Sequence, residues 1–137
     1  MKIIVAIDSL KGSLTSLEAG AAAREGILSA SPNSDVKIFP LADGGEGTCR
    51  AIIAGLGGKL KSVEVTAPLG GKVIAEFGEV LDKKLAVIEM ANAAGLPLVP
   101  EDKRNPLNTT TYGVGELIKL AIDEERNYIG VNVGKLD

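Results

Sequence analysis

The chain has 137 residues, of which 45% are apolar and only 3% aromatic, so its core is expected to consist of Val, Ile, Leu and Ala. It carries 15 basic and 18 acidic residues, and the net charge of -3 leaves no basic field that would attract nucleic acid. Histidine is absent, which removes the commonest general base and the commonest zinc ligand. With one cysteine, no apolar run of membrane-spanning length and no signal leader, we expect a cytoplasmic protein with neither nucleic acid nor membrane as a partner.

The first part of the chain alternates short apolar strands with helices. Residues 2–7 (KIIVAI) predict a strand buried on both faces, and residues 35–40 (DVKIFP) predict a second strand. Between them, Thr15 and Glu18 match a capping box that begins a helix running to about Ala30. The apolar side of this helix is expected to carry Leu17, Ala21 and Leu28.

A helix over residues 46–54 follows, after which the pattern changes to longer, partly exposed strands. The elements expected there are strands over 61–66, 73–77, 84–90 and 128–133, a turn at 68–71, an irregular segment over 92–107 and a helix over 113–125. The order predicts an α/β fold: a parallel or mixed sheet with flanking helices, with a Rossmann-like first lobe over 1–62 and part of a second α/β lobe over 63–137.

The loop DSLKGS, residues 8–13, follows the first strand and precedes the capped helix. Free backbone N–H groups, a positive helix end and Lys11 together suit an anionic ligand. The spacing of a P-loop is absent. The alternative is that Asp8 and Ser9 are ordinary turn residues and that Lys11 is a solvated charge.

The loop LADGGEGT, residues 41–48, places two acids among glycines at a strand-to-helix junction. Its glycines allow positive φ and the close approach of a ligand. Glu46 is explained by its place in the first turn of a helix, where a negative charge is favourable. Asp43 has no such explanation, and at the end of a strand it could bind magnesium or a substrate hydroxyl.

Two further features are candidates for the same site. The threonine run at 109–111 precedes a helix, and three hydroxyls exceed what one helix cap requires. Glu89 ends an apolar strand, where an acid needs a partner charge, a metal or a substrate hydroxyl unless the strand end reaches water.

Taken together, these segments resemble the bacterial glycerate kinase family, and the resemblance extends to about Ile129. The matching segments, in chain order, are DSLKGS (8–13), LADGGEGT (41–48), VTAPLGG (65–71), VIEMANAAGLPLVP (87–100) and RNPLNTTTYGVGELI (104–118). Several long segments that match in the order of the family identify it far more specifically than any single glycine-rich loop would.

The resemblance implies an enzyme that phosphorylates D-glycerate with ATP and Mg²⁺ in a cleft between two α/β lobes. The implied catalytic residues are Asp8, Lys11 and Asp43, with Lys11 stabilising the transferred charge. The residues implied in substrate binding are Ser9, Gly44, Gly45, Glu46, Glu89, Asn105, Thr109, Thr110 and Thr111.

The sequence departs from the family pattern in two places. Ile7 and Leu10 replace an expected proline and phenylalanine, which changes shape but not polarity. Family chains are longer and continue into a segment of the form GGSATNDGG, whereas residues 130–137 read GVNVGKLD. We therefore expect a truncated N-terminal portion, inactive alone, whose uncovered surfaces lead to self-association. The alternative is a non-catalytic small-anion-binding or assembly module.

Overall fold

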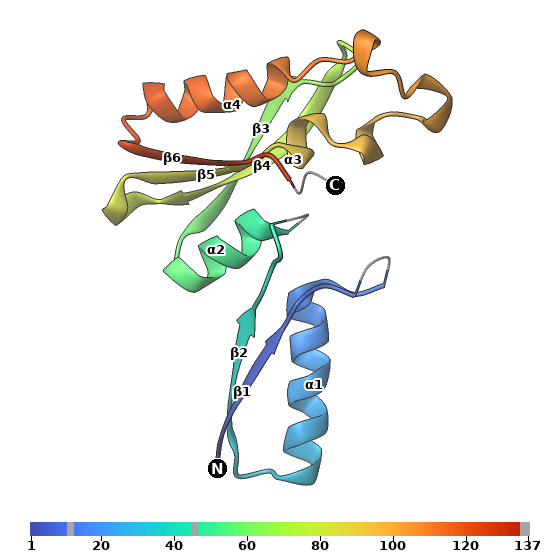
Figure 1. Cartoon of the computed structure of the whole chain (residues 1–137). Helices are drawn as coiled ribbons and strands as arrows, with labels where there is room; N and C mark the ends of the chain where they lie inside the picture. Colours follow the sequence, from blue (N-terminus) through green and yellow to red (C-terminus); the bar gives the residue numbers. More distant parts are fainter. Residues whose placement is uncertain (11–12, 45–46, 135–137) are drawn as a thin grey trace.

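The structure is a computed structural model that describes residues 1–10, 13–44 and 47–134. The described chain forms a two-stranded sheet, β1-β2, and a four-stranded sheet in the order β3-β4-β5-β6. Strands β1 and β2 are parallel, as are β5 and β6, while β4 is antiparallel to both β3 and β5. The predicted α/β fold with parallel and mixed sheets is confirmed (Figure 1).

The two-stranded sheet forms one layer with a single long helix packed along it (Figure 1). Its elements are β1 (Lys2–Ile7), α1 (Ser16–Ala30) and β2 (Asp35–Pro40). The predicted capping box begins α1 as expected, with the Thr15 and Glu18 side chains each bonded to the other residue's backbone N–H. The predicted helix face is wrong at Leu17 and Ala21, which are exposed, while Leu28 is half buried and the buried residues are Ala19 and Gly20. A Cβ at Gly20 would lie 2.5 Å from Cγ2 of Ile38, so the helix packs through its small residues.

Strand β1 is only half buried, which corrects the prediction of a strand buried on both faces. Both strands alternate between exposed and partly buried residues. Helix α1 covers one face, whereas on the other face Ile4 is 68% exposed and Phe39 is 48% exposed. The apolar composition that predicted burial is present, but within the described residues only one face of this sheet is covered.

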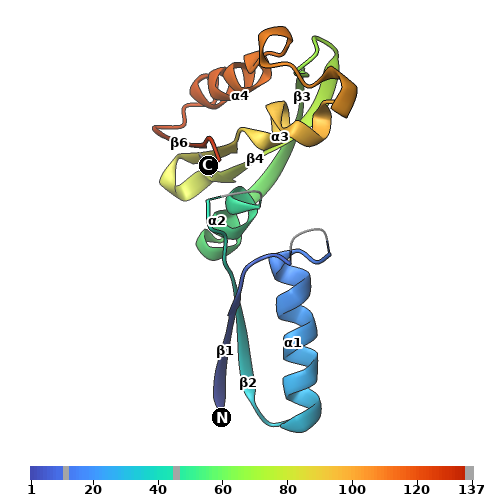
Figure 2. The same ribbon diagram turned by 45° about the vertical axis from the view of Figure 1, so that its right-hand side comes forward.

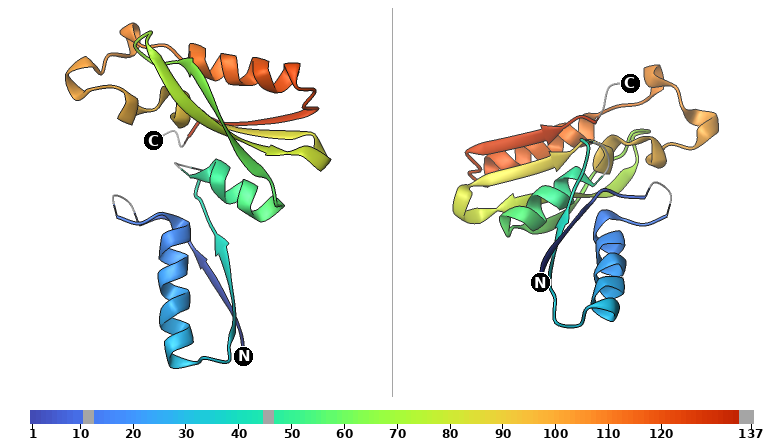
Figure 3. Two further views of the ribbon diagram at one scale, coloured as in Figure 1. Left: turned by 180° about the vertical axis from the view of Figure 1, so that it is seen from behind. Right: turned by 60° about the horizontal axis from the view of Figure 1, so that its bottom comes forward.

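The four-stranded sheet has helices on both faces. Its elements are α2 (Thr48–Leu56), β3 (Lys59–Thr66), β4 (Lys72–Val80), β5 (Leu85–Glu89), α3 (Ala91–Ala94), α4 (Tyr112–Asp123) and β6 (Tyr128–Asn132). Helices α3 and α4 cover one face, and α2 covers the other and lies between the two sheets, where it also contacts β2 (Figures 2 and 3). Two cores result, one around Phe77, Ile88 and Leu117 beneath α4 and one of Cys49, Ile53, Val80 and Val87 beneath α2.

The structure refines several predicted boundaries. Helix α2 begins at Thr48 and not at residue 46, because Gly47 takes φ 88 as the N-cap residue. The segment predicted as irregular contains α3 and three short 3-10 turns, at Leu96–Leu98, Glu101–Lys103 and Pro106–Asn108. The division of the chain at residues 62 and 63 stays a prediction.

Candidate functional site

The carboxyl ends of β1 and β2 lie side by side and are joined by one serine. Ile7 pairs with Pro40 at the end of the parallel ladder. The Ser16 hydroxyl donates to the carbonyl oxygen of Ile7 at 2.8 Å and accepts the N–H of Leu41 at 3.1 Å. The loops that follow the two strands therefore start from one fixed point. Sequence analysis did not identify Ser16, although a serine in the first turn of a helix after a strand is a signal that could be searched for.

Asp8 follows β1 directly, and Asp43 lies three residues beyond the end of β2. Oδ1 of Asp8 accepts the N–H of Ser9 at 2.7 Å, and both residues are half buried. Asp43 is exposed, and Gly44 after it has φ 94, the left-handed conformation that the glycine was expected to allow. The predicted site residues Lys11, Gly45 and Glu46 lie outside the described residues.

Glu89 is buried at the end of β5, with only 3% of its surface exposed. Its Oε1 accepts the N–H of Gly47 at 3.0 Å, and its Oε2 accepts the N–H of Cys49 at 2.9 Å. The acid that sequence analysis found without a partner is thus bonded to the backbone at the start of α2. It does not reach water, and its predicted role in substrate binding stays a prediction.

The threonine run lies beside the turn between β3 and β4. The N–H of Thr110 donates to the carbonyl oxygen of Pro68 at 2.9 Å, and its hydroxyl accepts the N–H of Tyr112 at 3.1 Å. Thr111 is the N-cap residue of α4, but its side chain makes no capping bond, so the expected cap comes from Thr110. The hydroxyl of Thr109 donates to the carbonyl oxygen of Pro106 at 3.5 Å.

Asn105 begins the last of the 3-10 turns, and its Oδ1 accepts the N–H of Leu107 at 3.0 Å. The segment that contains Asn105 and the threonines leads into α4, whereas the loops after β1 and β2 lie at the ends of the other sheet (Figure 1). The contacts described here thus fix the start of the Asp43 loop beside the end of β1 through Ser16, fix the end of that loop to Glu89, and connect the threonine run to the β3–β4 turn. That all of these residues surround one ligand stays a prediction.

Cys49 is a structural thiol and not a nucleophile. Burial, together with the nearby Glu89 carboxylate, raises the pKa of Cys49 from 9.0 to about 11. Its Sγ lies 3.1 Å from the carbonyl oxygen of Val87. A thiol with so high a pKa holds almost no thiolate at neutral pH.

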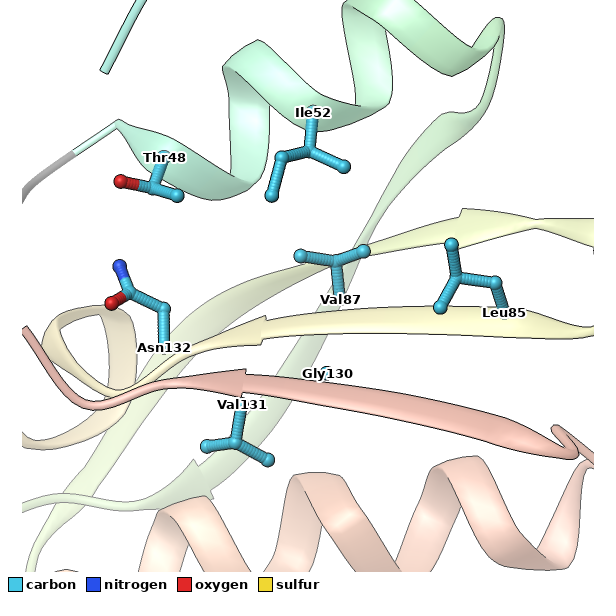
Figure 4. A pocket seen from close by; sticks show the side chains of 7 residues that line it. All are labelled: Thr48, Ile52, Leu85, Val87, Gly130, Val131 and Asn132. Carbon is cyan, nitrogen blue, oxygen red and sulfur yellow. The ribbon is translucent and has the colours of Figure 1, made fainter. Parts of the chain in front are cut away.

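A groove of about 330 Å³ lies between α2 and the β5–β6 edge, next to the start of α2 (Figure 4). It is lined by Thr48, Ile52, Leu85, Val87, Gly130, Val131 and Asn132. None of these residues carries a charge, so the groove suits apolar groups better than a small anion. We therefore place the candidate site at the strand ends and not in this groove.

Within the described ranges, no three His, Cys, Asp or Glu side chains gather as a metal centre would require. Across the same ranges, no helix is both long enough and apolar enough to span a membrane.

Acids and glycines at the ends of parallel strands are typical of α/β proteins that bind small polar ligands at that edge of the sheet. The family model for the glycerate kinase family matches residues 3–135. The chain belongs to the glycerate kinase family, as its sequence motifs predicted.

Curated relatives and one solved structure agree with this assignment. The chain is 54% identical over 123 residues to the glycerate kinase of Haemophilus influenzae, covering 90% of this chain and 32% of the relative. It is 52% identical over 133 residues to the glycerate kinase of Bacillus subtilis, covering 96% of this chain and 35% of the relative. It is 46% identical over 134 residues to the glycerate 2-kinase of Escherichia coli, covering 98% of this chain and 35% of the relative.

The solved structure is from Salmonella typhimurium LT2 and is provisionally named glycerate kinase 2. It matches with a TM-score of 0.84 at 46% identity, covering 98% of this chain and 36% of that one. The chain thus spans about a third of the length of the relatives it matches, and it corresponds to their N-terminal portion.

Proposed function

We propose that this chain supplies part of the active site of an ATP-dependent D-glycerate kinase. The observation that carries the proposal is the family match over residues 3–135. The geometry supports it, because Asp8 and the loop of Asp43 follow neighbouring parallel strands whose ends are fixed through Ser16. In the reaction, a glycerate hydroxyl oxygen bonds to the γ-phosphorus of ATP, the bond to the bridging oxygen breaks, and ADP leaves.

Asp43 is our candidate for the residue that orients this hydroxyl and accepts its proton, because it is exposed at the strand end. Asp8 would act from the neighbouring strand, and Lys11 would stabilise the transferred charge. The other residues proposed to bind substrate are Ser9, Gly44, Gly45, Glu46, Asn105, Thr109, Thr110 and Thr111.

The described residues fit a magnesium ion. Mg²⁺ is usually held by one or two carboxylates together with substrate phosphates and water. Asp8 follows β1 and Asp43 lies three residues beyond β2, so the loops at two neighbouring parallel strand ends each supply one carboxylate. When bound, Mg²⁺ would neutralise phosphate charge; Asp8 would hold it, which leaves the Asp43 carboxylate to accept the proton.

We further propose that the 137 residues do not catalyse the reaction alone, because the relatives are about three times as long. The uncovered face of the first sheet, with Ile4 and Phe39, would pack against the rest of a family-length chain. Without that cover, the same face would lead to self-association. The buried thiol of Cys49 and the net charge of -3 support a cytoplasmic enzyme with small-molecule substrates and neither nucleic acid nor membrane as a partner.

A family-length chimera tests the proposal: this chain replaces the matching third of the Bacillus subtilis relative, and ADP release is measured with D-glycerate, ATP and Mg²⁺. We expect turnover by the chimera and none by the 137 residues alone. ³¹P NMR of the product would identify which hydroxyl is phosphorylated. Turnover by the isolated chain would refute the claim that it is inactive. A folded chimera without turnover would favour a non-catalytic binding module.

Two substitutions in β2 and its loop provide a matched pair for the chimera. Asp43→Asn removes the proposed base and should lower kcat by about 10²–10⁴-fold. Asp35→Asn removes another exposed acid, at the opposite end of β2 from the Asp43 loop, and should leave kcat unchanged. Equal effects of the two substitutions would exclude Asp43 from the catalytic residues.

A further inference from the structure

The N-terminus of α2 carries an acidic side chain from a distant strand, at the position where a bound anion would lie. Gly47 is the N-cap residue of α2, and Cys49 is its second helical residue. Their N–H groups are among the donors that a helix leaves without partners at its start. The carboxylate of Glu89 accepts both of them, at 3.0 and 2.9 Å, and is 3% exposed.

The cap comes from another strand because the local sequence cannot provide one. Gly47 has φ 88, a conformation that side chains rarely adopt, so the position favours glycine. Glycine has no side-chain oxygen, and α2 makes no side-chain capping bond of its own. In return, the buried carboxylate of Glu89 needs donors, since an isolated buried charge is very costly. The Glu89 carboxylate therefore provides the acceptors that the start of α2 lacks, and the two N–H groups provide the donors that the buried carboxylate needs.

The same bond fixes one end of the loop that carries Asp43. At its start, the N–H of Leu41 is held by Ser16, at 3.1 Å. At its end, the N–H of Gly47 is held by Glu89. Asp43 lies between these two fixed points, so its placement relative to the second sheet depends on Glu89.

We propose that Glu89 is a positioning residue, which holds the Asp43 loop against the end of β5 and excludes phosphate groups from the start of α2. A phosphate at the amides of Gly47 and Cys49 would have to displace two charge-assisted hydrogen bonds and meet a like charge. The start of α2, although it lies at a strand-to-helix junction, is therefore not a site for the phosphates of ATP. The role given to Asp43 rests on the proposed function, whereas the exclusion of phosphate does not.

The exclusion of phosphate can be tested on the 137-residue chain without any substitution. Inorganic phosphate is titrated while the ¹⁵N-labelled amide resonances of Gly47 and Cys49 are followed by NMR. We expect neither resonance to move. A saturable shift of both would overturn the proposal, because it would show that the start of α2 binds phosphate despite Glu89.

The contact itself is tested by Glu89→Gln, in which an amide NH₂ replaces one acceptor oxygen. The resonances of Gly47 and Cys49 should move, and their hydrogen exchange should become faster. Glu76→Gln is the matched control, since Glu76 contacts α2 from the same sheet through Arg50, with its side chain 34% exposed. The control removes no acceptor from either N–H, so it should leave the hydrogen exchange of both amides unchanged. Unchanged amides in Glu89→Gln would overturn the assignment.

In the family-length chimera, Glu89→Gln should lower kcat by about 100-fold, the scale expected when a catalytic group moves by about 1 Å. KM for D-glycerate should change little, because Glu89 does not touch the substrate. In a second variant, Glu89→Ala, the carboxylate is removed, and added formate, which is small enough to take its place, should restore kcat. A raised KM with kcat unchanged would show direct substrate contact and overturn the positioning role. If the chimera has no activity, the proposed function fails, and the NMR experiments still decide the placement of Glu89.

Discussion

Helix α4 contains two glycines whose replacement by alanine should have opposite effects on stability. Alanine is the better helix former by about 0.5–1 kcal/mol, so an exposed helical glycine is improved by the change. At Gly115 an added Cβ meets nothing within 4 Å. At Gly113 it would lie 2.2 Å from the carbonyl oxygen of Thr66 and 3.1 Å from Cγ2 of Val65. The two positions share a helix and a substitution but differ in the space available.

The magnitude follows from this geometry. The contact with Thr66 is about 1.2 Å shorter than the 3.4 Å at which ordinary contact begins, and the contacted atom is backbone. Helix α4 must therefore move away from β3, which also stretches the 2.6 Å bond from the N–H of Thr66 to the Glu116 carboxylate. Overpacking of this kind costs about 1–3 kcal/mol. The gain in helix propensity is common to both variants and cancels, so we expect Gly113→Ala to be less stable than Gly115→Ala by the overpacking cost of about 1–3 kcal/mol.

Urea denaturation followed by circular dichroism measures the free energy of unfolding for the two variants and the parent chain. Gly115→Ala should be as stable as the parent or slightly more so, and Gly113→Ala should be clearly less stable. Amide NMR of Gly113→Ala should show its largest changes at Thr66. If the two variants are equally stable, the close packing of α4 on β3 is wrong.

Three further predictions concern titration and ion pairing. Because burial raises the pKa of Cys49 to about 11, Ellman's reagent should not label the folded chain at pH 8 but should label the chain unfolded in urea. The buried neutral thiol contributes to stability below pH 9.0, and the free energy of unfolding should fall as pH rises from 9.0 towards 11, because only the unfolded thiol ionises in that range. The hydrogen bond from the Thr66 N–H holds the pKa of Glu116 below its usual value of 4.5. The Glu116 carboxylate therefore stabilises the fold above pH 4.5, and this stabilisation is lost as pH falls below that value. The thermal unfolding temperature of Glu116→Gln should depend less on acid pH than that of the parent chain. The Arg126 guanidinium lies 2.8 Å from Glu79, and both side chains are mostly buried, so Arg126→Met should lower the free energy of unfolding by about 1.5–3 kcal/mol, whereas no loss would show that this pair does not stabilise the fold.

Local signals in the sequence were sufficient to predict most of the elements. The strand DVKIFP was predicted at the residues where β2 is found, and the capping box of Thr15 and Glu18 fixed the start of α1. These features depend on neighbours within a few residues, where propensity and capping decide the outcome. The start of α2 was misplaced because its N-cap residue is Gly47, which offers no capping side chain to recognise.

The candidate site was predicted only in part, because its contacts are long-range. The sequence indicated that Glu89 needs a partner, but its partners are backbone amides 42 and 40 residues earlier in the chain. Backbone groups have no signature in the sequence, so the search for a partner considered only side chains, metal, substrate and water. Ser16 was overlooked for the same reason, since its two bonds are also to backbone atoms.

The burial of the first sheet shows a different limit of sequence reasoning. A run such as KIIVAI shows how much apolar surface a strand has to bury, but it does not show which other part of the protein covers that surface. Parallel sheets are almost always covered on both faces, yet here α1 covers one face, and Ile4 on the other is 68% exposed. The prediction of two-sided burial was therefore wrong for the described residues, although it follows correctly from the composition of the strand. The mismatch supports our proposal that the face carrying Ile4 and Phe39 packs against the rest of a family-length chain, because the relatives extend over about three times the length of this one.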